Sequence, residues 1–598
     1  MSKFYEATLH QTSASAASCY ISELDKRVSI PLKFLNRALH GDQVLVKVKE
    51  EVGFVQKVLV RSAQLVTGQV QLGPHSAYVR PWSNNFFREF YVPLAETKGA
   101  KDGDVVEVRV GDWEKKDRHP SARVEKVLLH VTPDQYQMYR FGLPTKFSEA
   151  VLREVKELDP EVRLSADRID LTHLNLFTID PENCADRDDA LSVEQIKDGY
   201  RIGVHVADVT HYLKAGTELD REAYLRGNSL YLTNQVVPML PERLSSDLCS
   251  LAPEQDRYAL TLMVQVNASF EVVDKYLFRS VIRSRRAFSY REAELHKQDA
   301  ASPYYADLNL LDLIGSRVRH ALLPQELSFT TLRTRWETTN GQVKLRVEPT
   351  YSTMRLVQAW MLVANHLISV MLASKDVALY RVHPALDETR LTPLKAKLRH
   401  LNYHGDEQLS VEANLTRAQR QDADSLLSEL ISRSFRSAYY SPDALGHYAI
   451  GTPYYTHFTS PIRRYADVLV HRILQNLLDD KPVHSGDLHR VCQHLSQCER
   501  RSDRIATETD QLNAVALMKG VRYEMKAKII NQSKKGILVK TDLFINAWID
   551  QDELRGAHWN EQTHQWAGEI PHYIGDVLTV KLKEINYKTN QIYVVIAQ

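Results

Sequence analysis

The sequence predicts a multidomain α+β protein, in which a central mixed α/β region is flanked by three small OB-fold β-barrels. A turn followed by a largely alternating apolar and polar run occurs three times, and this pattern is typical of half-buried strands. Two copies lie near the N-terminus and one near the C-terminus, with mixed helical and strand patterns between them. The predicted domains are residues 1–62, 63–131, 132–518 and 519–598.

The three repeated turns share a Gly-Asp pair. H-G-D at 40–42 leads into Q-V-L-V-K-V, D-G-D at 102–104 into V-V-E-V-R-V, and I-G-D at 574–576 into V-L-T-V-K-L. The spacing of the first two fits one small barrel each. Small barrels of this kind include the OB-fold, which binds single-stranded nucleic acid through aromatic stacking and a basic groove.

Aromatic and basic residues in two of these barrels are candidates for stacking on nucleic acid. The simpler interpretation is that half or more of the aromatic side chains belong to the barrel cores, and the sequence leaves both open. The second barrel contains Tyr78, Trp82, Phe86, Phe87 and Arg88, and the third contains Tyr523, Phe544 and Trp548 among lysines 526, 528, 534, 535 and 540.

Composition excludes several classes of protein. The chain has 598 residues, 43% of them hydrophobic and 25% charged, as in ordinary globular proteins. A net charge of +1 excludes a uniformly basic nucleic-acid binder. Five cysteines without a C-x-x-C pair argue against a disulfide framework and a zinc site. No signal peptide begins the chain, and the apolar pattern of 354–373 is interrupted by polar residues, so we expect a cytoplasmic monomer without membrane contact.

The most informative stretch is L-N-L-F-T-I-D-P-E-N-C-A-D-R-D-D-A-L-S-V at 174–193. Asp180, Asp186, Asp188 and Asp189 lie here between two apolar runs, which we interpret as buried strands. Carboxylates this close repel one another, and burial increases the cost, so the cluster needs cations or shared protons. Hard divalent ions such as Mg²⁺ take oxygen ligands and are commonly shared with phosphates. The stretch therefore favours metal-assisted phosphate chemistry.

Three interpretations of this cluster differ in how well they fit. An EF-hand calcium loop counted from Asp180 does not fit, because its sixth position is Ala185 instead of glycine and its twelfth is Leu191 instead of glutamate. A solvated acidic turn is possible, but the apolar strands on both sides argue against it. A two-metal site that activates water and neutralises a leaving oxygen fits best.

A second motif, H-F-T-S-P-I-R-R-Y-A-D-V-L-V-H, spans 457–471. Ser460 is a good N-cap and Pro461 a good first residue, so we expect a helix to begin here, with Arg463 and Arg464 in its first turn. Cations oppose the helix dipole at that end, but they would suit a bound phosphate. Asp467 could fix the Arg463 guanidinium, and a simple surface ion pair between the two is an equally good interpretation.

Together these motifs resemble the RNase II / RNase R (RNB) family of 3′→5′ exoribonucleases. The resemblance rests on D-P-E-N-C-A-D-R-D-D-A, on the motif at 457–471, and on four further segments. It covers essentially the whole chain, and the family architecture implies two cold-shock OB domains, a central RNB catalytic domain and a C-terminal S1-type OB domain. The further segments are F-G-L-P-T-K-F at 141–147, R-I-D-L at 168–171, H-V-A-D-V at 205–209 and P-M-L-P-E-R-L-S-S-D-L-C-S-L at 238–251.

The resemblance implies a role for each candidate residue. The four aspartates correspond to the metal-site aspartates, with Asp188 indispensable, and Mg²⁺ or Mn²⁺ is the implied ion. Arg463 corresponds to the arginine that contacts the scissile phosphate, and Arg464 beside it is a further RNA-binding candidate. Tyr231, which on the sequence alone we would place in the core, corresponds to the aromatic that stacks on the 3′-terminal bases. Tyr290 is similar to a second RNA-contacting aromatic further along the channel.

The implied activity is processive hydrolysis of single-stranded RNA from its 3′ end to nucleoside 5′-monophosphates, which leaves a short oligonucleotide. One departure affects this expectation: the family commonly has a Glu-Glu pair where this chain has Gln358 and Ala359, so the grip on the RNA end is expected to differ. The start and end of the chain resemble RNase II more than RNase R, which implies poor degradation of stable duplexes. Two alternatives are a non-catalytic RNA-binding protein on a degenerate scaffold and a metal-dependent endoribonuclease.

Overall fold

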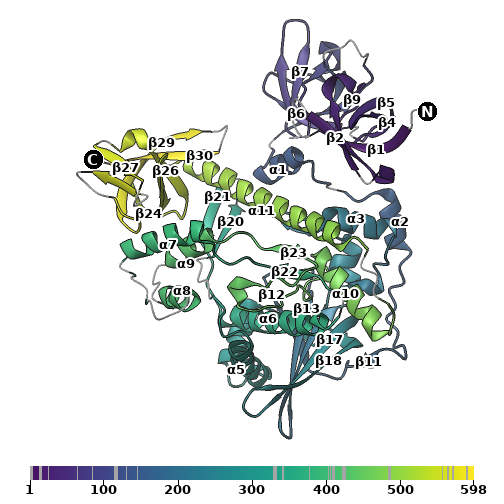
Figure 1. Ribbon diagram of the computed structural model, residues 1–598, viewed down its shortest axis with the longest axis vertical. Coiled ribbons are helices and arrows are strands. Elements are labelled where there is room, and N and C mark those ends of the chain that lie inside the picture. Colours follow the sequence, from purple (N-terminus) through teal and green to yellow (C-terminus); the bar gives the residue numbers. More distant parts are fainter. Residues whose placement is uncertain are drawn as a thin grey trace. The chain divides into compact units, whose positions relative to one another are not determined.

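The fold was analysed in a computed structural model (Figure 1). Two compact units, 1–146 and 147–598, are treated separately. The structure describes residues 4–11, 16–24, 26–62, 65–83, 85–113, 119–129, 131–144, 146–327, 333–339, 342–375, 377–401, 403, 406, 411–420, 426–482, 486–554, 556–561, 565–568, 572–586 and 590–597.

The first unit contains two small β structures, as predicted. The first is a closed barrel in the order β1-β2-β3-β5-β4, and the second is a five-stranded sheet in the order β10-β9-β6-β7-β8. The ends of the second sheet approach each other where Tyr91 bridges Ser121. The strands are β1 (Phe4–Gln11), β2 (Ala16–Ile21), β3 (Lys26–Pro31), β4 (Gln43–Lys49), β5 (Val52–Val60), β6 (Leu65–Leu72), β7 (Ala77–Pro81), β8 (Phe90–Val92), β9 (Val105–Val110) and β10 (Ala122–Leu128).

The repeated Gly-Asp turns have the same structure in all three copies. The glycine has a positive φ each time, 85°, 84° and 100° at positions 41, 103 and 575, which favours glycine because other residues are strained there. The aspartate carboxylate at 42, 104 and 576 accepts the N–H of the residue three positions earlier, at 2.7, 2.7 and 2.8 Å. A strand, β4, β9 or β29 (Val577–Asn586), begins one residue later. The internal repeat in the sequence therefore corresponds to a turn of the same local structure in all three copies.

The second unit is built around a seven-stranded mixed sheet in the order β11-β18-β17-β14-β13-β12-β19. Most residues of β13, β14 and β17 are buried, since helices and loops cover the sheet. Helices α5 (Tyr305–Leu322) and α6 (Ser352–Ala373) contribute to the same core. The strands are β11 (Ile169–Asp170), β12 (Leu176–Asp180), β13 (Asp189–Ile196), β14 (Gly199–Ala207), β17 (Asp256–Asn267), β18 (Val272–Arg283) and β19 (Arg286–Ser289).

Two of the segments flanking the aspartates have a structural role in this sheet. Arg168, from R-I-D-L, forms an ion pair of 2.7 Å with Asp208, from H-V-A-D-V, and both side chains are almost fully buried. The Arg168 guanidinium also lies 4.3 Å from the centre of the Tyr258 ring. Buried charges are tolerated when they are paired in this way. The ion pair therefore connects the start of β11 to the end of β14.

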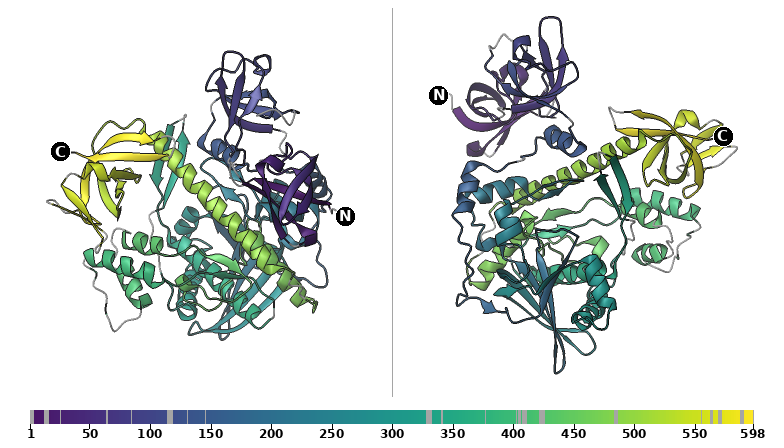
Figure 2. Two further views of the ribbon diagram at one scale, coloured as in Figure 1. Left: turned by 45° about the horizontal axis from the view of Figure 1, so that its top comes forward. Right: turned by 180° about the vertical axis from the view of Figure 1, so that it is seen from behind.

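The C-terminal part of this unit is a closed barrel in the order β24-β25-β26-β30-β29, so the predicted fold class is confirmed. The 31-residue helix α11 (Leu488–Met518) leads into the barrel, as both views in Figure 2 show. Helices α7 (Glu388–His400), α8 (Val411–Arg420) and α9 (Leu426–Ser434) share a hydrophobic core with it. The other barrel strands are β24 (Met525–Ser533), β25 (Gly536–Thr541), β26 (Asn546–Asp550) and β30 (Gln591–Ile596), and β27 (Ala557–Asn560) and β28 (Gln565–Gly568) form a separate pair.

Helix α6 is, among the described helices, the one long and apolar enough by composition to cross a membrane. Of its most apolar stretch, 56% is buried inside the protein, as expected for a core helix. The predicted domain boundaries are not tested by these observations and stay predictions.

Candidate active site

The aspartate cluster lies at the junction of two paired strands. Asp180 is the last residue of β12 and Asp189 the first of β13, so the flanking apolar runs are strands as predicted, and the two strands pair antiparallel. The loop between them is held by Ser250, whose hydroxyl donates to the carbonyl of Ala185 at 2.6 Å and accepts the N–H of Arg187 at 3.2 Å. Because Ser250 is itself fully buried, the loop has a fixed anchor.

The second motif meets this loop, but not as a helix N-terminus. Helix α10 begins at Tyr465 and ends at Leu478, so the prediction that it begins at Ser460 was wrong. The reason is a backbone pairing: Asn228 bridges Arg464, which holds Arg464 in an extended conformation (φ −136°, ψ 120°). Residues 461–463 form a turn before the helix instead.

This turn brings two donors to Asp188. The Ile462 N–H donates to Oδ1 of Asp188 at 2.8 Å, and Nε of Arg463 donates to Oδ2 at 3.3 Å. The expected pairing of Arg463 with Asp467 was wrong. Asp467 is fully buried and instead accepts from the N–H of Ser460 and from Nη2 of Arg464, both at 2.8 Å. Asp467 therefore stabilises the turn. Because Arg464 is its partner, the geometry favours a structural role for Arg464.

Burial and mutual repulsion raise the pKa values of three carboxyls of the cluster, Asp180, Asp188 and Asp189. Burial raises the pKa of Asp188 to about 7, against the opposing effects of Arg463 and the Ile462 N–H. Burial likewise raises the pKa of Asp180 to about 6. The pKa of Asp189 is well above its usual range, because of burial and then the charges of Asp180 and Asp188. A bound cation would relieve this cost by favouring the charged carboxylates.

The donor set fits a hard divalent cation. The candidate ligands are carboxylate oxygens, and Oδ2 of Asp180 is buried without a hydrogen-bond partner, so it is available to a metal ion. Among the residues that the structure describes, no three His, Cys, Asp or Glu side chains are already arranged around one point. The other contacts explain this: Asp188 faces Arg463, while Asp186 accepts a hydrogen bond from Tyr231.

The two predicted tyrosines both lie beside the aspartates. Tyr231, in β15 (Leu230–Tyr231), is 43% exposed, and its hydroxyl donates to Asp186 at 2.6 Å, so it is not a core residue. Tyr290 is the first residue of α4 (Tyr290–Gln298), and its pKa is raised to about 12 by burial and by the charges of Asp189 and Asp180. The structure thus brings both rings to the same site.

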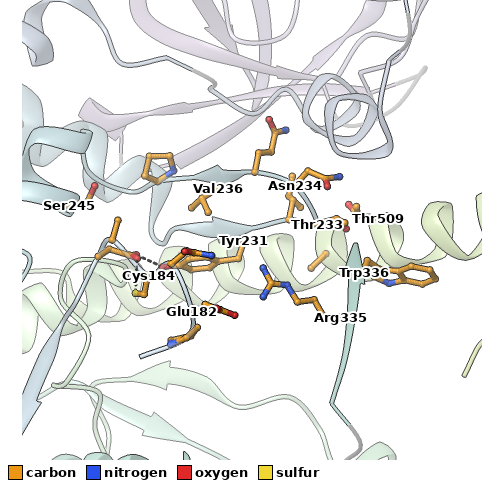
Figure 3. A pocket seen from close by; sticks show the side chains of 18 of the residues that line it. Glu182, Cys184, Tyr231, Thr233, Asn234, Val236, Ser245, Arg335, Trp336 and Thr509 are labelled. Carbon is orange, nitrogen blue, oxygen red and sulfur yellow. Dashed lines mark hydrogen bonds between the residues drawn. The ribbon is translucent and has the colours of Figure 1, made fainter. Parts of the chain in front are cut away.

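A pocket of about 900 Å³ opens next to Tyr231 and Asp186 (Figure 3). Its walls are the 181–186 loop, residues 231–236, the strand β20 (Thr334–Thr339) and helix α11 around Thr509. Arg335 and Trp336 of β20 also line this pocket, and sequence reasoning missed them, because a β-hairpin far along the chain carries no motif. Ser250 and the Ile462 N–H were also missed, although both lie within quoted motifs.

Comparisons with known proteins agree with this geometry. Residues 168–480, just over half the chain, match the sequence model of the RNB domain, and residues 78–148 match that of the cold shock domain. Ribonuclease R of Aquifex aeolicus is 30% identical, with 83% of this chain and 74% of that protein covered. The chain belongs to the RNase II / RNase R (RNB) family.

Other RNB relatives extend the match over nearly the whole chain. Ribonuclease R of Thermotoga maritima is 27% identical over 96% of this chain and 87% of its own length. The fold is similar to that of Mycoplasma genitalium RNase R in complex with ribose methylated single-stranded RNA, with a TM-score of 0.80, 21% identity, and coverage of 99% and 100%. It is also similar to yeast Ssd1, a pseudonuclease, with a TM-score of 0.62, 19% identity, and coverage of 98% and 82%.

The departure from the RNB pattern lies in α6. Gln358 is exposed on this helix and Ala359 is buried against the core, 3% exposed. Neither supplies a carboxylate, so the expected change in how the RNA end is held stays a prediction. The relation to RNase II over RNase R also stays a prediction, since the relatives named here are both called Ribonuclease R.

The raised pKa of Asp188 predicts a pH-dependent stability without divalent cations. The pKa of the Asp188 carboxyl is higher in the folded protein than in the unfolded chain. Its contribution to the free energy of unfolding is therefore fully present below pH ~4 and is lost as the pH rises to about 7. Asn cannot ionise, so Asp188→Asn in EDTA is expected to raise Tm by about 2 °C or more near pH 8. The gain should shrink toward pH ~4, where both side chains are neutral. Equal Tm values of both proteins across this range, by calorimetry, would contradict the assignment.

Proposed function

We propose that this chain is a 3′→5′ exoribonuclease that hydrolyses single-stranded RNA to nucleoside 5′-monophosphates with Mg²⁺, or with Mn²⁺ in its place. The observation that carries the proposal is the convergence on Asp188. Asp188 is a buried carboxylate beside three further aspartates, and the turn at 461–463 brings the Ile462 N–H and the Arg463 side chain to it. Membership of the RNB family and the relatives named Ribonuclease R support the reaction.

The residues of the site have distinct roles in this reaction. Asp180, Asp186, Asp188 and Asp189 would hold the divalent cation, which when bound activates water and neutralises the leaving oxygen. Arg463 stabilises the negative charge that develops on the scissile phosphate; its side chain is 44% exposed and lies beside Asp188. The Asp467 carboxylate positions the turn that carries Arg463. Tyr231 contacts the bases of the RNA end, and Tyr290 contacts the RNA further along the channel.

Tyr231 is expected to act through its ring more than through its hydroxyl. Stacking of a base on an aromatic ring contributes about 1–3 kcal/mol, so Tyr231→Ala should weaken binding of a short RNA by about tenfold or more and change the length of the final product. Tyr231→Phe keeps the ring and loses only the hydrogen bond to Asp186, so it should stay close to the wild type. Binding constants and product lengths of both variants test this, and a larger effect of Tyr231→Phe would contradict it.

The test of the proposed function is the product pattern from 5′-labelled single-stranded RNA with Mg²⁺. The proposal expects the labelled strand to shorten progressively from its 3′ end to a short core. Internal fragments without this progression would indicate an endoribonuclease. Intact RNA that stays bound would indicate a non-catalytic protein, an alternative kept open by the missing carboxylates at 358 and 359 and by the similar fold of a pseudonuclease.

A further inference from the structure

The turn that carries Ile462 and Arg463 follows a segment without regular secondary structure. Residues 454–458 belong to no helix or strand, yet Phe458 is fully buried. Buried backbone N–H and C=O groups outside helices and sheets need other partners, because they have given up their hydrogen bonds to water. The partners of Phe458 are side chains, and they come from two different helices of the second unit.

Asn365 of α6 holds the backbone N–H of Phe458. Its Oδ1 accepts this N–H at 2.8 Å, and its Nδ2 donates to the hydroxyl of Tyr455 at 3.1 Å. Both groups of the Asn365 amide therefore have a partner, and the side chains of Asn365 and Tyr455 are buried. Helix α6 lacks the carboxylates of the RNB pattern at 358 and 359, but Asn365 connects this helix to the segment before the turn.

His471 of α10 holds the carbonyl of the same residue. Its Nε2 lies 2.8 Å from the Phe458 oxygen and carries the proton of this hydrogen bond, because a carbonyl oxygen only accepts. The imidazole ring is fully buried and packs against the Phe458 ring, with 4.8 Å between the ring centres. Nδ1 is also buried and has no hydrogen-bond partner in the part of the chain that the structure describes, so the ring is held there by Phe458 alone among polar groups.

The two anchored backbone groups lie close in sequence to the contacts with the aspartate cluster. Three residues separate Phe458 from Ile462, whose N–H donates to Asp188 at 2.8 Å. The next residue, Arg463, reaches the other oxygen of the same carboxylate at 3.3 Å. The direction in which the chain leaves Phe458 therefore decides where the Arg463 guanidinium lies. A misplacement of about 1 Å in an active site can cost about 100-fold in rate.

We propose that Asn365 and His471 are positioning residues for the hydrolysis of RNA. By holding both backbone groups of Phe458, they fix the turn that presents Arg463 to Asp188. In the described part of the chain, neither side chain forms a hydrogen bond or an ion pair with the four aspartates or with the arginine, so each acts through the Phe458 backbone. The effect on hydrolysis rests on the proposed function, and the anchoring of the turn does not.

The first experiment is a double-mutant cycle between His471 and Arg463. His471→Leu removes the donor to the Phe458 carbonyl, and we expect it to lower kcat by about 10- to 100-fold with little change in KM for single-stranded RNA. In the Arg463→Ala background the same change should cost less than about twofold, because the group that it positions is absent. His471→Gln restores an N–H donor and should recover most of the rate. Asn365→Leu, which removes the acceptor of the Phe458 N–H, should behave as His471→Leu does.

The matched control is His494→Leu. Nε2 of His494, on α11, donates to the carbonyl of Tyr224 at 2.7 Å, and the two ring centres are 4.2 Å apart. His494 thus makes the same two kinds of contact as His471, but with a residue outside the 457–471 motif. The control variant should lose some Tm and keep the kcat of the wild type. An equal loss of kcat in His494→Leu and His471→Leu would overturn the proposal.

Hydrogen exchange locates the effect without RNA or divalent cation. Mass spectrometry of His471→Leu should show faster amide exchange in residues 457–464 than in the wild type, while His494→Leu should match the wild type there. Unchanged exchange in this segment, or losses of kcat that add fully in the Arg463→Ala background, would overturn the proposal. A wild-type protein that hydrolyses no RNA, together with the expected exchange, would refute the proposed function and support the anchoring of the turn.

Discussion

Replacing Asp188 by Asn is expected to reduce the rate of RNA hydrolysis by at least about 1,000-fold, equal to about 4 kcal/mol of transition-state stabilisation. Asn has nearly the same shape, and its carbonyl oxygen can still accept the N–H of Ile462. It cannot supply the charged oxygen that Arg463 contacts and that would serve as a ligand to a divalent cation. The loss should therefore fall on turnover, and the fold should be kept.

Binding of RNA separates this expectation from simple misfolding. The variant should bind single-stranded RNA as tightly as the wild type, because the aromatic rings, the barrels and Arg463 are unchanged. Single-turnover hydrolysis and anisotropy on one RNA provide both values. Residual hydrolysis within about tenfold of the wild type would remove Asp188 from the centre of the mechanism, and a parallel loss of binding would indicate a structural role.

Replacing Arg463 by Ala is expected to lower kcat by about 100- to 1,000-fold, the cost of losing one group that stabilises developing negative charge. The Arg463 side chain is 44% exposed and its contact with Asp188 is long, at 3.3 Å, so its removal takes only a partly solvated donor from that buried carboxylate, which keeps the N–H of Ile462. The loss should appear in kcat with little change in Tm. Lysine at this position keeps the charge and should recover part of the rate.

The neighbouring arginine provides the matched control. The Arg464 side chain is 21% exposed and pairs with the fully buried Asp467. Arg464→Ala therefore leaves a buried carboxylate without its cationic partner. Loss of such a partner costs about 3–5 kcal/mol of stability, so the main effect of Arg464→Ala should be a lower Tm. Steady-state kinetics and thermal unfolding of both variants test the contrast. A large loss of Tm in Arg463→Ala, or of kcat alone in Arg464→Ala, would reverse the two assignments.

The parts of the structure that could be predicted from the sequence depend on local chemistry. The Gly-Asp turns were predictable because the positive φ and the carboxylate cap act within four residues. The strands around Asp180 and Asp189 were predictable because burial on both faces requires apolar runs. The pairing of Arg168 with Asp208 joins segments that the sequence keeps 40 positions apart, and neither segment indicated its partner.

The two errors in the 457–471 motif have one physical cause, which is tertiary pairing that overrides local sequence preference. Ser-Pro is a strong helix start, yet the bridge from Asn228 keeps Arg464 extended and delays the helix to Tyr465. The same pairing exchanges the partners of the two arginines, so Asp467 binds Arg464 while Arg463 turns to Asp188. The local sequence favoured a core position for Tyr231, but in the structure its side chain faces the pocket (Figure 3).

The most direct test of the central claim is the identity of the first product from single-stranded RNA labelled in its 3′-terminal nucleotide. With Mg²⁺ present, the account predicts that the label is released at once as a nucleoside 5′-monophosphate, before any longer labelled fragment forms. Asp188→Asn, assayed in parallel, should leave the label on intact RNA. Release of the label in oligonucleotides, or as a nucleoside without phosphate, would contradict the account.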